Sequence, residues 1–254
     1  MAHALKLYWG LWSACNTGDI EYLKRQYAEY GDEVLSLMKE WNLIYYSPIN
    51  TACQKNYALI VRWWLANIKN HFWVNITDSC GKTLLFIACE HGHLALVSLL
   101  TGKHSTNINM SNYHPFTPLA MACKNGHKRV VKMLLSQPDL FHDSQLPSCY
   151  LSALYVASFE GLENMVELLL QNPKTDINRK NGPRGDTPLM AAVKNSHFLV
   201  IHCLLANSNL DLDVKNNEGM DVLDIAREIQ KCLPVYAKKG AMVFILETHK
   251  QSSK

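Results

Sequence analysis

The segment Thr117-Pro118-Leu119-Ala120-Met121-Ala122, followed by Gly126-His127, decides the fold. The same pattern returns at Thr187-Pro188-Leu189-Met190-Ala191-Ala192, before a Ser-His pair, and at Thr83-Leu84-Leu85-Phe86-Ile87-Ala88, before a Gly-His pair. Weaker copies begin at Ser152 and at Ser47-Pro48. A pattern that returns along a chain is the signature of a repeat protein and has to be identified before single elements are assigned.

The last alanine of each copy recurs along the whole chain, at Ala14, Ala52, Ala88, Ala122, Ala157, Ala192 and Ala226. Successive alanines are 38, 36, 34, 35, 35 and 34 residues apart. A second apolar signal follows the alanine in step, as Val130-Val131-x-Met133-Leu134-Leu135 and Val166-x-x-Leu169-Leu170 show. The sequence therefore predicts seven structural units of nearly constant length.

Each unit is predicted to be a helix, a tight turn, an antiparallel helix and an extended hairpin. The hydroxyl of Thr117 caps the first helix, and Pro118 gives up only an amide that has no partner at the first helical position. Gly126 permits the left-handed turn that ends this helix. The stripe Val130–Leu135 has helical spacing and cannot be buried by one unit alone, so neighbouring units must stack.

These Thr-Pro-Leu-x-x-Ala, Gly-His and Leu-Leu signals resemble the ankyrin-repeat family over about residues 5–233. The resemblance implies an all-α fold, an ankyrin-repeat solenoid of stacked helix-turn-helix units joined by short hairpin loops. It also implies that the histidine of Gly-His hydrogen-bonds backbone groups of the turn. About seven repeats are expected, of which the first two and the last are divergent.

Three regions are expected along the chain. Residues 1–75 form divergent N-terminal units rich in aromatic side chains, because all six tryptophans lie between Trp9 and Trp73 and residues 32–41 lengthen the first joint. Residues 76–215 form the regular repeats. Residues 216–254 form a C-terminal capping unit and a frayed tail, with Pro234 between its two helical segments.

Composition excludes several classes of protein. The formal net charge of +3 is too small an excess to indicate nucleic-acid binding, and no apolar run approaches the roughly 18 residues of a membrane span. We therefore expect no nucleic-acid partner and no membrane insertion. The short apolar stretch Leu7–Trp12 is weak as a secretory signal, which favours a cytoplasmic protein, with the nucleus as a further possibility.

Cysteines and histidines are interpreted as structural residues. Cys15, Cys53, Cys89 and Cys123 each follow an anchor alanine, and stacked helices are about 8–10 Å apart, too far for a disulfide between neighbours. No disulfides are expected. No pair of Cys-x-x-Cys or His-x-x-x-His type accompanies the Gly-His histidines, and no nucleophile with a base and an orienting group can be nominated. We expect no metal, no cofactor and no catalytic residue.

The resemblance also indicates where a partner would bind. In ankyrin stacks the contacting positions are the hairpin-tip residues before the Thr-Pro-Leu signal and the two residues that follow Ala-x. On this chain the predicted groove consists of Tyr113, His114, Phe116, Lys124, Asn125, Leu151, Phe159, Glu160, Arg184, Asp186, Lys194 and Asn195. Its middle is apolar with basic residues around it, which is typical of an interaction site. Asn178 resembles ankyrin asparagines that are hydroxylated.

The leading functional hypothesis is a non-enzymatic protein–protein interaction module, acting as an adaptor, a scaffold or a sequestering inhibitor. The groove is expected to bind a protein segment with apolar anchors and some acidic residues. The first alternative is a secreted bacterial or parasite effector that engages proteins in the host cytosol. The second is an enzyme with an active site hidden in residues 1–75.

Overall fold

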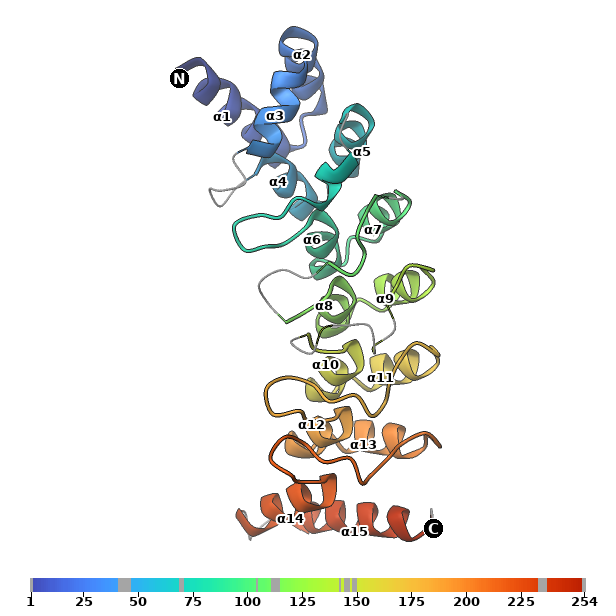
Figure 1. Cartoon of the computed structure of the whole chain (residues 1–254). Coiled ribbons are helices and arrows are strands. Elements are labelled where there is room, and N and C mark those ends of the chain that lie inside the picture. The colour runs from blue at the N-terminus through green and yellow to red at the C-terminus, as the bar shows by residue number, and fades with distance from the viewer. Residues whose placement is uncertain are drawn as a thin grey trace. The chain divides into compact units, whose positions relative to one another are not determined.

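The computed structural model describes residues 2–40, 47–68, 71–103, 105–110, 115–141, 143, 147, 150–232 and 237–252. Its regular elements in these ranges are helices, accompanied by two isolated β-bridges, Thr77 with Thr83 and Asn181 with Asp186. The chain divides into two compact units, Met1–Leu140 and Phe141–Lys254, and each is described by itself. The fold is all-α, and each unit is a stack of helix-turn-helix repeats (Figure 1).

The first unit stacks four helices that carry an anchor alanine, here called first helices. They are α1 (Ala2–Thr17), α4 (Pro48–Gln54), α6 (Leu84–Glu90) and α8 (Pro118–Lys124). The outer helices behind them, which also pack in succession, are α5 (Ala58–Asn67), α7 (Leu94–Thr101) and α9 (Lys128–Leu135). The N-terminal repeat differs because two helices follow α1, namely α2 (Ile20–Tyr30) and α3 (Asp32–Glu40). A short 3-10 helix, η2 (His71–Asn75), precedes α6.

The second unit repeats this arrangement. Its first helices α10 (Ala153–Phe159), α12 (Pro188–Lys194) and α14 (Val222–Cys232) pack in succession. The outer helices are α11 (Glu163–Leu170), α13 (Phe198–Leu205) and α15 (Ala237–Ser252). Helix α15 packs against α14.

Hydroxyl caps begin four of the first helices. Thr83, Thr117, Ser152 and Thr187 each accept a hydrogen bond from the backbone amide three residues later, with oxygen–nitrogen distances of 3.1, 3.2, 3.2 and 3.3 Å. Such a cap stabilises a helix by about 1 kcal/mol. The capping role that the sequence predicts for Thr117 is confirmed.

The histidines of the Gly-His and Ser-His pairs each join one repeat to the repeat before it. Nε2 of His93, His127 and His197 lies 2.9, 3.0 and 2.9 Å from the carbonyl oxygens of Gln54, Glu90 and Phe159, which end the preceding first helices. The glycines leave room for these rings. A Cβ on Gly92, whose φ is +72°, would lie 2.5 Å from Nδ1 of His127. The histidine thus bonds the turn of the neighbouring repeat.

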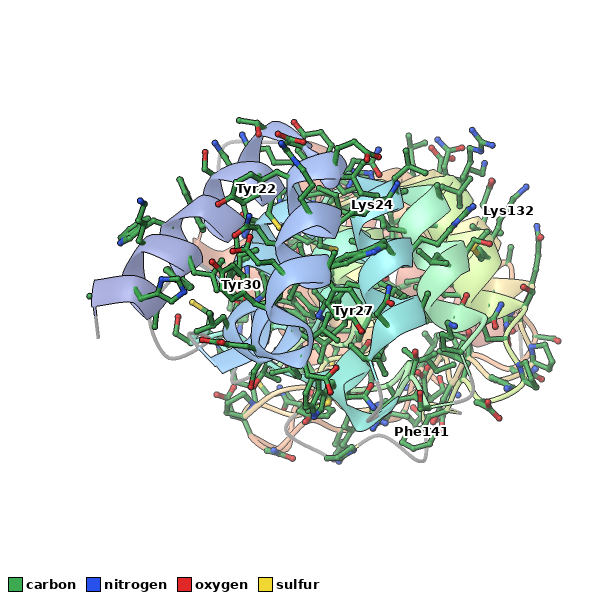
Figure 2. All side chains as sticks on the ribbon, turned by 90° about the horizontal axis from the view of Figure 1, so that it is seen from above. Tyr22, Lys24, Tyr27, Tyr30, Lys132 and Phe141 are labelled. Carbon is green, nitrogen blue, oxygen red and sulfur yellow. The ribbon has the colours of Figure 1, made fainter. Side chains whose placement is uncertain are left out.

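The N-terminal repeats make the same joint with other residues. Tyr57 stands where the later repeats have histidine, and its hydroxyl donates to the carbonyl of Asn16 at 3.5 Å. Aromatic rings fill the surrounding space: Tyr27 and Trp63 meet edge to face at 5.5 Å, and Trp64 is fully buried. Figure 2 shows Tyr27 among the other tyrosines of α2. Aromatic side chains therefore contribute to packing in the N-terminal repeats.

The column of cysteines is buried in the first unit. Cys15, Cys53, Cys89 and Cys123 are free thiols with little or no exposure. The thiol of Cys53 donates to the carbonyl of Leu84 at 3.3 Å, and burial raises the pKa of Cys53 to about 12. These thiols stay protonated and serve as small packing groups.

Candidate protein-binding surface

The two kinds of predicted contact position in each repeat lie next to each other. One is the residue before the helix cap, and the other is the second residue after the anchor alanine, eight residues later in the chain. In the third repeat they are Lys82 and Glu90, and Nζ of Lys82 lies 2.8 Å from both carboxylate oxygens of Glu90. The same ammonium lies 5.8 Å from the ring centroid of Phe86. The charges of Lys82 and Glu90 therefore pair with each other within this repeat.

In the fourth repeat the same two positions hold an aromatic ring and a cation. Nζ of Lys124 lies 5.0 Å from the ring centroid of Phe116, within the range of a cation–π interaction. The amide of Asn125 donates to the carbonyl of Glu90 at 2.7 Å, so its orientation is fixed by the preceding repeat. Two further members of the predicted groove, Tyr113 and His114, lie outside the described residues.

The fifth repeat presents apolar side chains at these positions. Leu151 is half-buried, whereas the Phe159 side chain at the end of α10 remains 47% exposed. The ring of Tyr155 stacks on Phe159 with a centroid distance of 6.3 Å. Tyr155 was missed by sequence reasoning, although its spacing of four residues from Phe159 places both rings on one helix face. Glu160 follows Phe159 and is exposed.

The sixth repeat again has an ion pair at these two positions, but here the acidic residue precedes the helix cap and the basic residue follows eight positions later. The Asp186 side chain is 5% exposed. One carboxylate oxygen lies 2.6 Å from Nζ of Lys194, and the other accepts from Asn216 Nδ2 at 3.0 Å. Its backbone pairs with that of Asn181 in both directions, which closes the hairpin. Asp186 is thus buried by its own partners, and its predicted role as a partner contact stays a prediction. The Asn195 amide donates to Ala191 within its own helix.

The last basic residue of the predicted groove, Arg184, also has a partner. Its guanidinium donates to both carboxylate oxygens of Glu218 at 3.1 and 3.2 Å, which links two successive hairpins. Both side chains are exposed, at 60% and 43%.

Burial raises the pKa of the nearby Tyr155 hydroxyl, and the charge of Asp186 adds to this effect while Arg184 opposes it. In the second unit, the stacked rings of Tyr155 and Phe159 therefore form the main apolar part of the candidate surface.

Asn178 lies at a joint between hairpins. Its side-chain amide donates to the carbonyl of Asn209 at 2.7 Å, and its side-chain oxygen accepts from the amide of Asp211 at 2.9 Å. The residue is half-buried. Both ends of the side chain thus hold the next loop, so an enzyme that modifies Asn178 would have to open this joint. Its hydroxylation stays a prediction.

One group of side chains in the described residues has the composition of a metal site. Ligand atoms of Glu163, Glu167 and Cys203 lie within 4.8 Å of one another. A structural zinc site uses four ligands, usually cysteine and histidine, so this group of two carboxylates and one thiol is incomplete. Among the described helices, none has the length and apolar character needed to cross a membrane.

Comparison with known proteins identifies ankyrin repeats along nearly the whole chain. The family model described as "Ankyrin repeats (3 copies)" matches residues 11–112, 49–144, 110–181 and 154–235. The crystal structure of the human ASB11 ankyrin repeat domain is 26% identical, with a TM-score of 0.68, over 92% of this chain and 96% of that one. The ankyrin repeat domain of Bcl-3, described as a member of the IkappaB family, is 21% identical, with a TM-score of 0.69, over 85% and 92%.

A curated relative matches over a shorter range. Alpha-latrocrustotoxin-Lt1a of Latrodectus tredecimguttatus is 32% identical over 78 residues, which is 31% of this chain. The chain spans 5% of the length of that toxin. The match therefore concerns a few repeats of a much longer protein.

Proposed function

The chain belongs to the ankyrin-repeat family, and on this basis we propose that it is a non-enzymatic interaction module that binds a segment of another protein. Ankyrin repeat domains generally mediate protein–protein interaction and typically carry no catalytic activity. The proposed contact surface consists of the hairpin-tip and first-helix positions described above, without Asp186. An adaptor, a scaffold and a sequestering inhibitor all need such a surface.

The exposed ring of Phe159 is the observation that carries this proposal. A phenylalanine that is 47% exposed and stacked on a second ring offers a large rigid apolar surface, and aromatic residues are common energetic anchors of interfaces. The third and sixth repeats instead have ion pairs at the positions equivalent to Leu151 and Phe159. We assign the energetic centre of the surface in the second unit to Tyr155 and Phe159. In the first unit, Phe116 is the apolar residue at a proposed contact position.

The charge distribution supports a partner with acidic residues. Between Glu90 and Asp139 the sequence contains no aspartate or glutamate, and Lys124 is the basic residue at a predicted contact position in this stretch. Lys124 is exposed beside the Phe116 ring, so an apolar contact and a cation are available together. The proposed partner segment therefore has apolar anchors and nearby carboxylates.

A crosslinked pull-down from lysate of the source cells, read by mass spectrometry, tests the proposal. The baits are the wild type, the Phe116→Ala/Phe159→Ala variant and the control Leu59→Ala, which removes a 65% exposed side chain from outer helix α5. Circular dichroism establishes that all three are folded. We expect a protein that the wild type and the control recover and the double variant loses. Equal recovery by all three baits would show that binding does not use this surface.

The secreted-effector alternative makes a separate prediction. An effector would be transferred into host cells when expressed with a reporter tag in a producing organism. Both roles use the same binding surface, so a binding experiment does not distinguish them. A translocation assay with the tagged full chain does.

A further inference from the structure

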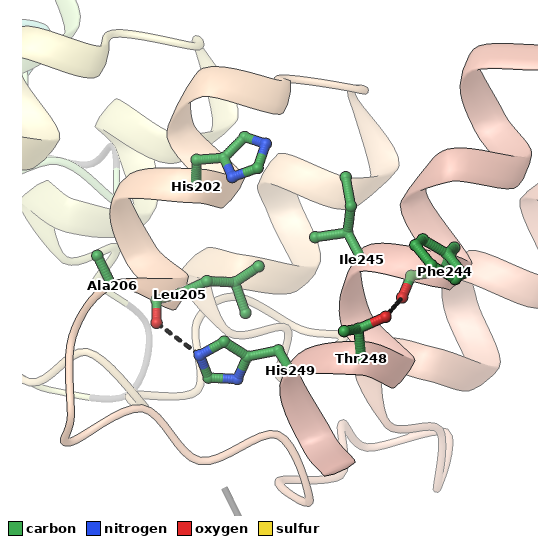
Figure 3. A pocket seen from close by; sticks show the side chains of 7 residues that line it. All are labelled: His202, Leu205, Ala206, Phe244, Ile245, Thr248 and His249. Carbon is green, nitrogen blue, oxygen red and sulfur yellow. Dashed lines mark hydrogen bonds between the residues drawn. The ribbon is translucent and has the colours of Figure 1, made fainter. Parts of the chain in front are cut away.

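The C-terminal end of the second unit has a pocket on its outer side. Its volume is about 470 Å³. It is lined by His202 and Leu205 of α13, by Ala206, which follows that helix, and by Phe244, Ile245, Thr248 and His249 of α15 (Figure 3). Phe244 is 70% exposed. The two polar groups of α15 serve the helices themselves. Thr248 donates to the carbonyl of Phe244 at 2.7 Å, and Nε2 of His249 donates to the carbonyl of Leu205 at 2.7 Å. The pocket surface is left mainly apolar.

The sequence of α13 differs from its equivalents at the outward positions. In α9 these positions hold Lys128, Arg129 and Lys132, and in α11 they hold Glu163, Asn164 and Glu167. In α13 they hold Phe198, Leu199 and His202. A helix that is apolar on nearly all sides is normally buried, yet Leu199 is 62% exposed. Within the second unit, these outward positions therefore change from charged in α11 to uncharged in α13, which also lines the pocket.

A pair of carboxylates borders this apolar surface. Glu163 and Glu167 are one helical turn apart on α11, and their oxygens lie within 4.8 Å of each other and of the Cys203 sulfur on α13. In the described part of the chain neither carboxylate takes part in an ion pair or a side-chain hydrogen bond. Two like charges at this spacing destabilise a helix slightly, and a cation between them would relieve the repulsion.

The carboxylates and the pocket are connected through Leu199. On a helix surface, residues three and four positions apart are neighbours. Leu199 is therefore next to His202, which lines the pocket, and next to Cys203, which faces the two carboxylates. Leu199 thus lies on α13 between the residue that lines the pocket and the residue that faces the carboxylates.

We propose that this outer surface is a second docking site, and that its occupant is a basic amphipathic helix of another protein. One apolar side chain of that helix enters the pocket beside Phe244, and a second one covers Leu199. A lysine or arginine one or two turns away pairs with Glu163 and Glu167. The negative charges of Glu163 and Glu167 favour a basic partner at this site. The segment proposed for the first-helix surface is instead acidic, so the two sites take different partners. The site is separate from Phe159, so it can fail while the proposed function holds.

Selection from a phage-displayed library of amphipathic helical peptides of about 16 residues tests this site, with the full chain as the target. The enriched peptides are then measured by fluorescence anisotropy. We expect them to combine lysine or arginine with apolar residues at i, i+3, i+4 and i+7 spacing. Leu199→Lys and the double variant Glu163→Lys/Glu167→Lys should each weaken binding about tenfold or more.

The matched control is Leu59→Lys, since Leu59 occupies the same repeat position on α5 and is 65% exposed. This control and Phe159→Ala should leave peptide affinity unchanged, and all variants should melt like the wild type. Three results would overturn the proposal: enrichment of acidic peptides, no enrichment, or affinity that Leu199→Lys does not alter. A concentration-dependent dimer that Leu199→Lys dissolves would also overturn it, because the occupant would then be a second copy of this chain.

Discussion

The third and sixth repeats use the same two positions for an ion pair, but they orient it in opposite directions. In the third repeat the lysine, Lys82, precedes the helix cap, whereas in the sixth repeat the aspartate, Asp186, occupies that place. The exposed fractions of the acidic side chains differ, at 23% for Glu90 and 5% for Asp186. A contact position therefore acquires its role from the residue eight positions away, and burial decides how much the pair stabilises the fold.

The fifth repeat shows what happens when neither position is charged. Leu151 and Phe159 occupy the places of Asp186 and Lys194, and Phe159 stays exposed. Repeats with an ion pair at these positions neutralise themselves, whereas the fifth repeat keeps apolar surface for a partner. The following changes test this distinction.

The largest effect is expected for Asp186→Ala. This change leaves Lys194 and Asn216 without their shared acceptor in a nearly fully buried place, and breaking a buried pair typically costs about 3 kcal/mol. Urea denaturation should show the loss as a lower midpoint with an unchanged slope. A midpoint equal to that of the wild type would mean that the pair does not stabilise the repeat.

Glu90→Ala should cost less. Both members of the third-repeat pair are partly exposed, at 24% and 23%, so the expected loss is about 1 kcal/mol. The same denaturation experiment measures it. A loss as large as that of Asp186→Ala would contradict the argument that burial sets the difference between the two repeats.

The polarity swap Lys82→Glu/Glu90→Lys should be nearly neutral, within about 0.5 kcal/mol, because it gives the third repeat the orientation of the sixth. Each single change should be destabilising, since it places two like charges together. A double-mutant cycle measures the coupling between them. If the double variant loses as much as the sum of the single variants, the two positions are not interchangeable.

Arg184→Ala should have the smallest effect on stability. The pair with Glu218 is well exposed on both sides, and pairs of this kind contribute little to folding. The urea midpoint should not shift measurably. A clear decrease would show that the link between these two hairpins is structural.

Most of the fold could be predicted from the sequence, because the signals are local. The cap at Thr117 and the left-handed glycine Gly126 need only a few neighbouring residues to be recognised, and the structure has them as expected. Ser196 and Asn56 take the same left-handed conformation, with φ of 59° and 62°, at the position that Gly92, Gly126 and Gly161 occupy in other repeats. The conformation is thus imposed by the repeat as well as by the residue type.

The surface was harder to predict, because its properties depend on pairs. Sequence position places Asp186 at a hairpin tip, but its burial results from Lys194 and from Asn216 of the next repeat. The same reason explains why Tyr155 was missed: its ring becomes part of the surface by stacking on Phe159. The joint histidines bond carbonyls about one repeat away, which no local pattern indicates.

The most direct test of the account converts the fifth repeat into the sixth. Leu151→Asp with Phe159→Lys should form an ion pair between the two positions, so the melting temperature should change little. The affinity for the partner recovered in the pull-down, measured by calorimetry, should fall about a hundredfold. The matched control is Lys82→Leu/Glu90→Phe, which makes the third repeat apolar and should keep partner binding. A folded Leu151→Asp/Phe159→Lys variant with the affinity of the wild type would contradict the account.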